Sequence, residues 1–216
     1  MDCLFKLNYS KLCVLVEETL NIKNWFVRKD TITSRTEAIE QSERYKFLKK
    51  QAEKTKIIFN KEEIVTWLDS LNILYFVFDA IEDKNLKDHI KIIQEYSIPY
   101  LNKRPDYLLI YDNKILIIEF SFNKLEYEMQ YEAKLSQAIN YKEILSNLLP
   151  KEIDIGTYTF LVEPEEDIYR NTFTIKNTDF YPNHYKIEQL AKYIEKFFKK
   201  NINLAIIELN RISQTN

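Results

Sequence analysis

Two runs rich in β-branched and aromatic residues lie on either side of the dipeptide Asp112-Asn113. The runs cover residues 107–111 and 115–122, and each has the length of an ordinary strand. An Asp-Asn pair is a favourable tight turn between such runs, because both residue types tolerate turn conformations that most residues avoid. The sequence therefore predicts a β-hairpin, which also predicts which residues of the two strands face each other.

Segments with helical periodicity precede and follow this hairpin. Asn60 can cap a helix whose third position is Glu63, and apolar residues follow at helical spacing as far as the wholly apolar run 73–78. Residues 126–149 return to helical spacing after the hairpin, with an apolar stripe formed by Leu135, Ala138, Ile139, Leu145 and Leu149. Further strands are expected at 90–98 and 157–162. The order of helix, three strands, helix and strand indicates an α/β (α+β) fold with a mixed central sheet flanked by helices.

The outer segments are expected to be helical additions to this core. The charged stretch 35–56 has few apolar residues and predicts a weakly amphipathic helix on the surface. An apolar stripe over 187–198 predicts a long final helix, whereas 204–209 fits either a strand or a helix. We expect one domain over 1–216, made of a helical N-terminal extension (1–56), a core (60–165) and a C-terminal helical addition (166–216).

The single glycine among 216 residues excludes the glycine-rich phosphate loops of nucleotide-binding folds, which need several glycines at fixed spacing. The formal net charge of -2 demands no polyanionic partner, but it permits a local basic patch. His89 and His184 have no partner at metal-binding spacing, and Cys3 and Cys13 are too few for a zinc site. No signal peptide is visible and no apolar run could span a bilayer, so we expect a cytoplasmic protein with reduced thiols and no membrane contact.

The turn at Asp112-Asn113 sets the register of the hairpin. Counting outward from it, Asp106 faces Glu119, and Cβ atoms in such opposed positions lie about 4.5–5.5 Å apart. Like charges so placed are destabilising by up to about 1 kcal/mol. A divalent cation between them would relieve this repulsion, hold a scissile phosphate and activate a water. A one-residue slip would break the arrangement.

Further polar side chains are expected beside this pair. The same register places Ser121 opposite Arg104, and Glu119 shares a strand face with Ser121 while Phe120 points the other way. Glu95, on the preceding strand, could add a third metal ligand or simply face solvent. Taken singly, each carboxylate has a plainer explanation, as a strand-start or edge residue. In matched register, the two favour a metal site.

The residues Arg104-Pro105-Asp106, followed by Glu119-Phe120-Ser121, resemble the PD-(D/E)XK nuclease superfamily. The order of Trp67, the run 95–99 and Asp106 looks most like the nuclease-like domain of DUF2075-type DNA/RNA helicases. Gln137 and Tyr141, four residues apart and thus on one helix face, resemble the Q-x-x-x-Y helix of RecB-like and lambda-exonuclease-like members.

This resemblance covers about residues 60–165. It implies a restriction-endonuclease-like core in which Asp106 and Glu119 bind Mg²⁺ or Mn²⁺. The implied activity is hydrolysis of phosphodiester bonds in DNA, or in RNA as the less favoured substrate. Gln137 would lie near the metal, and Arg104, Lys124 and Tyr141 would contact nucleic acid.

Ser121 departs from the family, which has a lysine at this position to position the water and stabilise charge in the transition state. Lys124, Lys134 or Arg104 could replace that charge. In the alternative, the chain has kept the fold without catalysis and binds nucleic acid or a protein partner. The two hypotheses differ in whether a lysine or arginine nitrogen reaches the Asp106–Glu119 pair.

Overall fold

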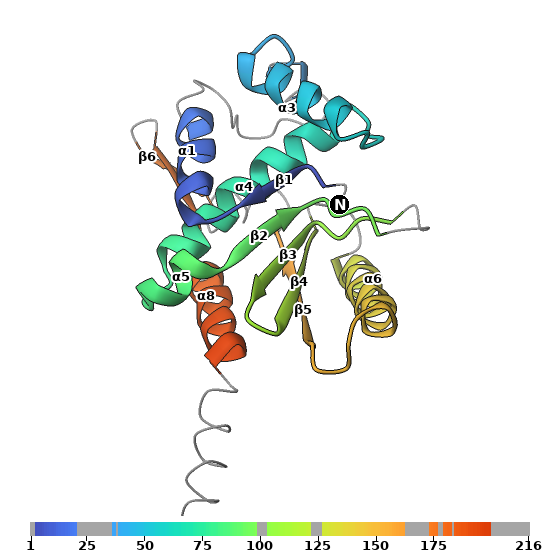
Figure 1. Cartoon of the computed structure of the whole chain (residues 1–216). Coiled ribbons are helices and arrows are strands. Elements are labelled where there is room, and N and C mark those ends of the chain that lie inside the picture. Colours follow the sequence, from blue (N-terminus) through green and yellow to red (C-terminus); the bar gives the residue numbers. More distant parts are fainter. Residues whose placement is uncertain are drawn as a thin grey trace, which may run out of the picture.

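A mixed five-stranded sheet, in the order β1-β2-β3-β4-β5, lies at the centre of the computed structural model (Figure 1). The structure describes residues 3–20, 36–37, 39–98, 103–121, 127–162, 173–176, 179–182 and 184–199. The sheet strands are β1 (Phe5–Leu7), β2 (Lys91–Gln94), β3 (Tyr107–Tyr111), β4 (Lys114–Ser121) and β5 (Asp154–Leu161). The helices are α1 (Tyr9–Leu20), α3 (Glu43–Lys54), α4 (Glu63–Asp79), α5 (Lys84–His89), α6 (Tyr127–Leu148) and α8 (His184–Lys199). The expected α/β fold with helices flanking a mixed sheet is confirmed.

The β3–β4 hairpin has the predicted register. Tyr111 pairs with Lys114 and Tyr107 pairs with Ile118, while Asp112 adopts a positive φ of 53° in the turn. One step beyond the ladder, the Asp106 backbone N–H donates to Glu119 Oε1 at 3.0 Å. Asp106 therefore lies opposite Glu119, as the sequence predicts.

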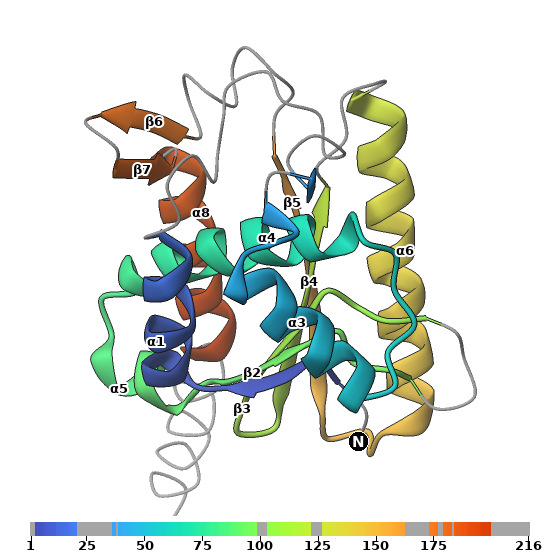
Figure 2. The same cartoon turned by 90° about the horizontal axis from the view of Figure 1, so that it is seen from above.

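The two faces of the sheet bury different sets of side chains. β5 runs parallel to β4, and α6 forms the crossover between them. α6 covers one face through Tyr141 and Leu145, which pack with Leu108 and Ile117. α4 and α8 lie on the other face, where Leu109, Ile118 and Phe120 enter a larger core (Figure 2). This alternation places Glu119 on the face covered by α6.

The N-terminal extension differs from the prediction of helices alone. β1 adds an edge strand antiparallel to β2, with Lys6 opposite Ile93. Within the stretch 35–56, where one helix is expected, Thr36, Glu37 and Ile39 are helical and α3 begins at Glu43. Ser42 caps α3 by accepting from the Tyr45 backbone N–H. α3 is also more firmly docked than a surface helix, since Tyr45, Leu48 and Ala52 are buried in the main core.

Other element boundaries need smaller corrections. The strand expected over 90–98 ends at Gln94, because Glu95 takes a positive φ of 53°. Ile139 is 43% exposed and so lies outside the buried stripe of α6. The C-terminal addition is not only helical, since β6 (Phe173–Lys176) and β7 (Asp179–Pro182) pair as a hairpin before α8. The final helix is confirmed, whereas 204–209 lies outside the described residues. Among the helices described, none is long and apolar enough to cross a membrane.

A buried lysine joins the hairpin to the end of α8. Lys114 is 2% exposed, and its Nζ donates to the backbone oxygen of Phe197 at 2.6 Å and lies 3.4 Å from that of Phe198. These carbonyls end the helix, so a positive charge there is favourable. The Phe197 ring in turn packs onto Gly156 of β5, where only a residue without a side chain fits.

Replacement of Gly156 by alanine should test this contact. The added Cβ would lie 2.6 Å from Phe197 Cε2, so the ring must move away from its place beside Lys114. We expect Gly156→Ala to lower the free energy of unfolding by about 1–2 kcal/mol, measured by urea denaturation. The double variant Gly156→Ala/Phe197→Leu should recover part of this loss, and equal stability of Gly156→Ala and wild type would contradict the packing described.

Candidate active site

A pocket of about 680 Å³ lies at the end of the sheet away from the hairpin turn, between the start of α4 and the N-terminal half of α6. Its residues come from both helices and from the ends of β2, β3 and β4. They are Glu62, Glu63, Thr66, Trp67, Ser70, Glu95, Arg104, Asp106, Phe120, Ser121, Ala133, Lys134 and Gln137. Most of the residues that the sequence singled out therefore lie around one cavity.

Asp106, Glu119 and Lys134 form a charged cluster beside this pocket. Lys134 Nζ donates to Glu119 Oε2 at 2.9 Å and lies 3.6 Å from Asp106 Oδ2. The Phe120 backbone N–H donates to the same Asp106 oxygen at 2.7 Å. Glu119 is fully buried, whereas the Asp106 side chain keeps 24% exposure. A lysine on α6 therefore provides a positive charge at the carboxylate pair.

Burial dominates the electrostatics of this cluster. Burial, reinforced by the charge of Asp106, raises the pKa of Glu119 to about 8. Burial also raises the pKa of Asp106, although Lys134 opposes that shift. Burial alone would lower the pKa of Lys134, but the two carboxylates outweigh it and raise this pKa above its usual value. The carboxylates therefore hold protons more readily than free side chains, and Lys134 stays charged.

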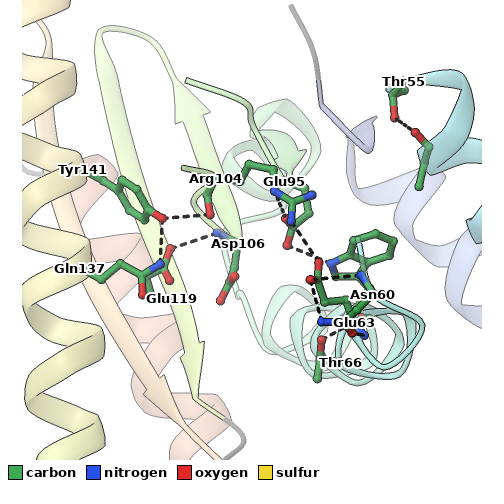
Figure 3. Close-up of polar contacts among 12 residues, drawn as sticks. Thr55, Asn60, Glu63, Thr66, Glu95, Arg104, Asp106, Glu119, Gln137 and Tyr141 are labelled. Carbon is green, nitrogen blue, oxygen red and sulfur yellow. Dashed lines mark hydrogen bonds and ion pairs between the residues drawn. The ribbon is translucent and has the colours of Figure 1, made fainter. Parts of the chain in front are cut away.

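Arg104 ties the start of β3 to α4. Its Nη2 donates to Glu63 Oε2 at 3.0 Å, and its Nε lies 3.4 Å from Glu95 Oε2 (Figure 3). The Trp67 indole N–H donates to the other oxygen of Glu95 at 3.0 Å. Burial raises the pKa of Glu95 well above its usual value, with Asp106 adding to the shift and Arg104 opposing it. Glu95 is thus engaged with Trp67 and Arg104, and Arg104 is turned away from its expected place opposite Ser121.

Glu63 is hydrogen-bonded both to Asn60 and to Arg104. Its backbone N–H donates to Asn60 Oδ1 at 3.0 Å, and its own Oε1 accepts from the Asn60 side chain at 3.2 Å. These contacts are the reciprocal hydrogen bonds that the capping box predicts, but α4 begins only at Glu63, which is therefore its first residue and not its third. Because Oε2 of the same carboxylate accepts from Arg104, the start of α4 is fixed to the site.

Gln137 and Tyr141 approach from α6, on the side opposite α4 (Figure 3). The Gln137 side chain donates to Tyr141 Oη at 2.8 Å, and that hydroxyl donates to the Arg104 backbone oxygen at 3.2 Å. Tyr141 is only 3% exposed, so it is placed to position the chain before Asp106 rather than to touch a large ligand. Gln137 lines the pocket and can reach a ligand there.

Lys134 shares a helix face with the two α6 residues that the sequence singled out. Lys134, Gln137 and Tyr141 recur at intervals of three and four and so lie on one face of α6. Ser70, which the sequence reasoning missed, follows Glu63 and Trp67 at similar spacing on α4; its hydroxyl lies 3.0 Å from that of the buried Tyr107. Ser121 lines the pocket as predicted, whereas Lys124 lies outside the described residues.

The carboxylate pair fits a cation that takes few protein ligands. Among the described residues, no group of three or more His, Cys, Asp or Glu side chains could hold a metal ion. Mg²⁺ is commonly held by one or two carboxylates, with waters and substrate phosphate completing its shell. Asp106 Oδ1 accepts no hydrogen bond from any described residue, so it is the oxygen best placed to bind a cation. Glu119 oxygens retain lone pairs beside their existing bonds.

No protein-family model and no curated protein matches the chain.

The buried state of Glu119 predicts a pH dependence of stability. Its pKa is about 8 in the folded protein against 4.5 ordinarily, so folding favours the protonated carboxyl. The stabilisation is complete below about pH 4.5 and is lost as the pH rises toward about 8. We therefore expect the Tm of Glu119→Gln, relative to wild type, to rise between about pH 5 and about pH 9. Glu188→Gln, on an exposed part of α8, should show a constant difference; a constant difference for Glu119→Gln would refute the assignment.

Proposed function

We propose that this protein is a divalent-metal-dependent nuclease that hydrolyses phosphodiester bonds, with DNA favoured over RNA as its substrate. The observation that carries the proposal is the approach of Lys134 Nζ to within 2.9 Å of Glu119 and 3.6 Å of Asp106. Two carboxylates in matched register with a lysine supply the charges that the PD-(D/E)XK resemblance leads one to expect. The lysine comes from α6 instead of position 121.

Each residue has a role that follows from its contacts. Asp106 and Glu119 would bind Mg²⁺ or Mn²⁺, which supplies charge for the phosphate oxygens and activates the attacking water. Lys134 would orient that water and stabilise the negative charge that develops on the phosphate. Tyr141 and Arg104 fix the segment that carries Asp106 and act as positioning residues. We place this activity in the cytoplasm.

A second function, binding without cleavage, is favoured by the saturation of Glu119. Both of its oxygens already accept hydrogen bonds, from the Asp106 backbone and from Lys134, and its side chain is fully buried. A balanced buried ion pair of this kind can serve structure alone. The chain would then be a module of the same fold that binds nucleic acid or a protein partner.

Cleavage of labelled DNA and RNA, single-stranded and duplex, with Mg²⁺ or Mn²⁺ separates the two functions. Wild type should cut at least one substrate, and Asp106→Asn and Glu119→Gln should abolish the activity. Glu188→Gln replaces an exposed carboxylate on α8 and serves as the matched control. If wild type and Asp106→Asn release the same traces of product with every substrate and metal, the nuclease proposal is wrong.

Lys134→Met tests the role of the lysine on α6. Loss of one group that stabilises transition-state charge typically lowers kcat by about 100-fold to 1,000-fold, and we expect a loss of this size. Lys142→Met removes an exposed lysine two turns further along the same helix and should leave kcat unchanged. Single-turnover kinetics with saturating enzyme would separate this effect from weaker binding. Cleavage by Lys134→Met at the wild-type rate would remove Lys134 from the mechanism.

A further inference from the structure

The charges that line the pocket do not favour binding of a polyanion. Four of its lining residues, Glu62, Glu63, Glu95 and Asp106, are acidic. Its two basic residues, Arg104 and Lys134, already bind carboxylates. Nucleic acids are held mainly by lysines and arginines that neutralise phosphates, and the whole chain has a net charge of -2. If the pocket cuts nucleic acid, the binding energy must come from another surface.

A concentration of exposed lysines occurs on α3 and the segment that follows it. Residues 43–61 contain six lysines and only two glutamates, and all six lysines are exposed. Four of them, Lys46, Lys49, Lys50 and Lys54, lie on the outer side of α3 and are called the α3 lysine face below. Lys56 and Lys61 continue the charge toward α4.

The α3 lysine face has a fixed orientation. Tyr45, Leu48 and Ala52 bury the opposite side of the helix in the core, and the Gln51 side chain donates to the Leu4 backbone oxygen at 2.9 Å. Lysines four residues apart rise by about 6 Å along a helix, a spacing that suits successive phosphates of one strand. The face is therefore a preformed row of charges.

The lysines of this face are also less neutralised than those of α8. Lys49, Lys50 and Lys54 form no ion pair with any residue in the described part of the chain, and only Lys46 pairs, with Glu43 at 2.9 Å. On α8, by contrast, Lys192 pairs with Glu188 and Lys199 with Asp83. A free row of ammonium groups can release counterions when it meets phosphates.

The position of α3 connects this face with the pocket. α3 packs against α4 (Figure 2), and the segment after it leads through Lys61 directly into Glu62 and Glu63 on the pocket wall. A membrane surface is a poorer partner for α3, because membrane-bound amphipathic helices insert a broad exposed apolar face. Tyr45, Leu48 and Ala52 of α3 are buried in the core, and Phe47, which is 45% exposed, stacks on Phe5.

We propose that the α3 lysine face binds the phosphate backbone of the nucleic acid on which the pocket acts. This inference rests on the proposed function and assigns binding and chemistry to two different surfaces. The basic face supplies affinity without reading sequence, and the acidic pocket supplies chemistry.

The test is the binding of fluorescent single-stranded and duplex oligonucleotides to the full chain, without divalent metal, followed by anisotropy over about 50–200 mM salt. The variant Lys49→Gln/Lys50→Gln/Lys54→Gln removes three phosphate contacts. It should lower the salt slope by about two for a single strand and about three for a duplex. Near 0.1 M salt the corresponding loss of affinity is about 100-fold or more. The control Lys84→Gln/Lys192→Gln/Lys196→Gln removes three exposed lysines from α5 and α8 and should bind as wild type.

The outcomes separate this inference from the nuclease proposal. Equal affinity and salt slope in the two triple variants would overturn the role of α3, whatever the cleavage assay shows. No binding by wild type at low salt would overturn it as well, as would lysine-dependent binding to anionic lipid vesicles in place of oligonucleotides. Lysine-dependent binding by a protein that cuts no substrate would support the α3 face and reject only the catalytic step. Unchanged thermal unfolding of both variants establishes that folding is intact.

Discussion

The burial of Glu119 within an interior strand is the constraint on which the site depends. A lone charged carboxylate in that position would be strongly disfavoured. Two neighbours stabilise it, the Asp106 backbone N–H and the Lys134 ammonium group, and burial itself favours its protonation. Asp106 lies just before β3, and Lys134 lies on α6. The hairpin register, the docking of α6 and the charge state of the cluster are therefore linked.

Polar side chains from α4, α6 and the end of β2 all contact Arg104, two residues before Asp106. Arg104 is held through its side chain by Glu63 and Glu95, and through its backbone oxygen by Tyr141. The two helices that flank the pocket thus both act on the residues just before Asp106. A small displacement of α4 or α6 would therefore move the Asp106 carboxylate. Such coupling suits a site whose chemistry needs fixed geometry.

The features that followed from the sequence are those set by local rules. The turn at Asp112-Asn113 sets the register that places Asp106 opposite Glu119. The spacing of Asn60 and Glu63 predicts the hydrogen bonds between them, although α4 begins only at Glu63. The choice of Lys134 among three cations could not be made, because it depends on how α6 is rotated against the sheet. β1 was missed because three residues are too few to show a period. The buried role of Tyr141 depends on tertiary packing that a motif does not report.

The burial of Lys114 bears on where this chain can be divided. The core suggested by sequence, residues 60–165, contains Lys114 but lacks α8, whose last carbonyls accept the ammonium group. A fragment with those limits would lose the carbonyls that accept from Lys114, together with the apolar side chains of α8 that belong to the main core. The same fragment would lose β1 and α3 from the edge of the sheet. Residues 60–165 are therefore incomplete as a packing unit, because α8 covers part of the core that they form.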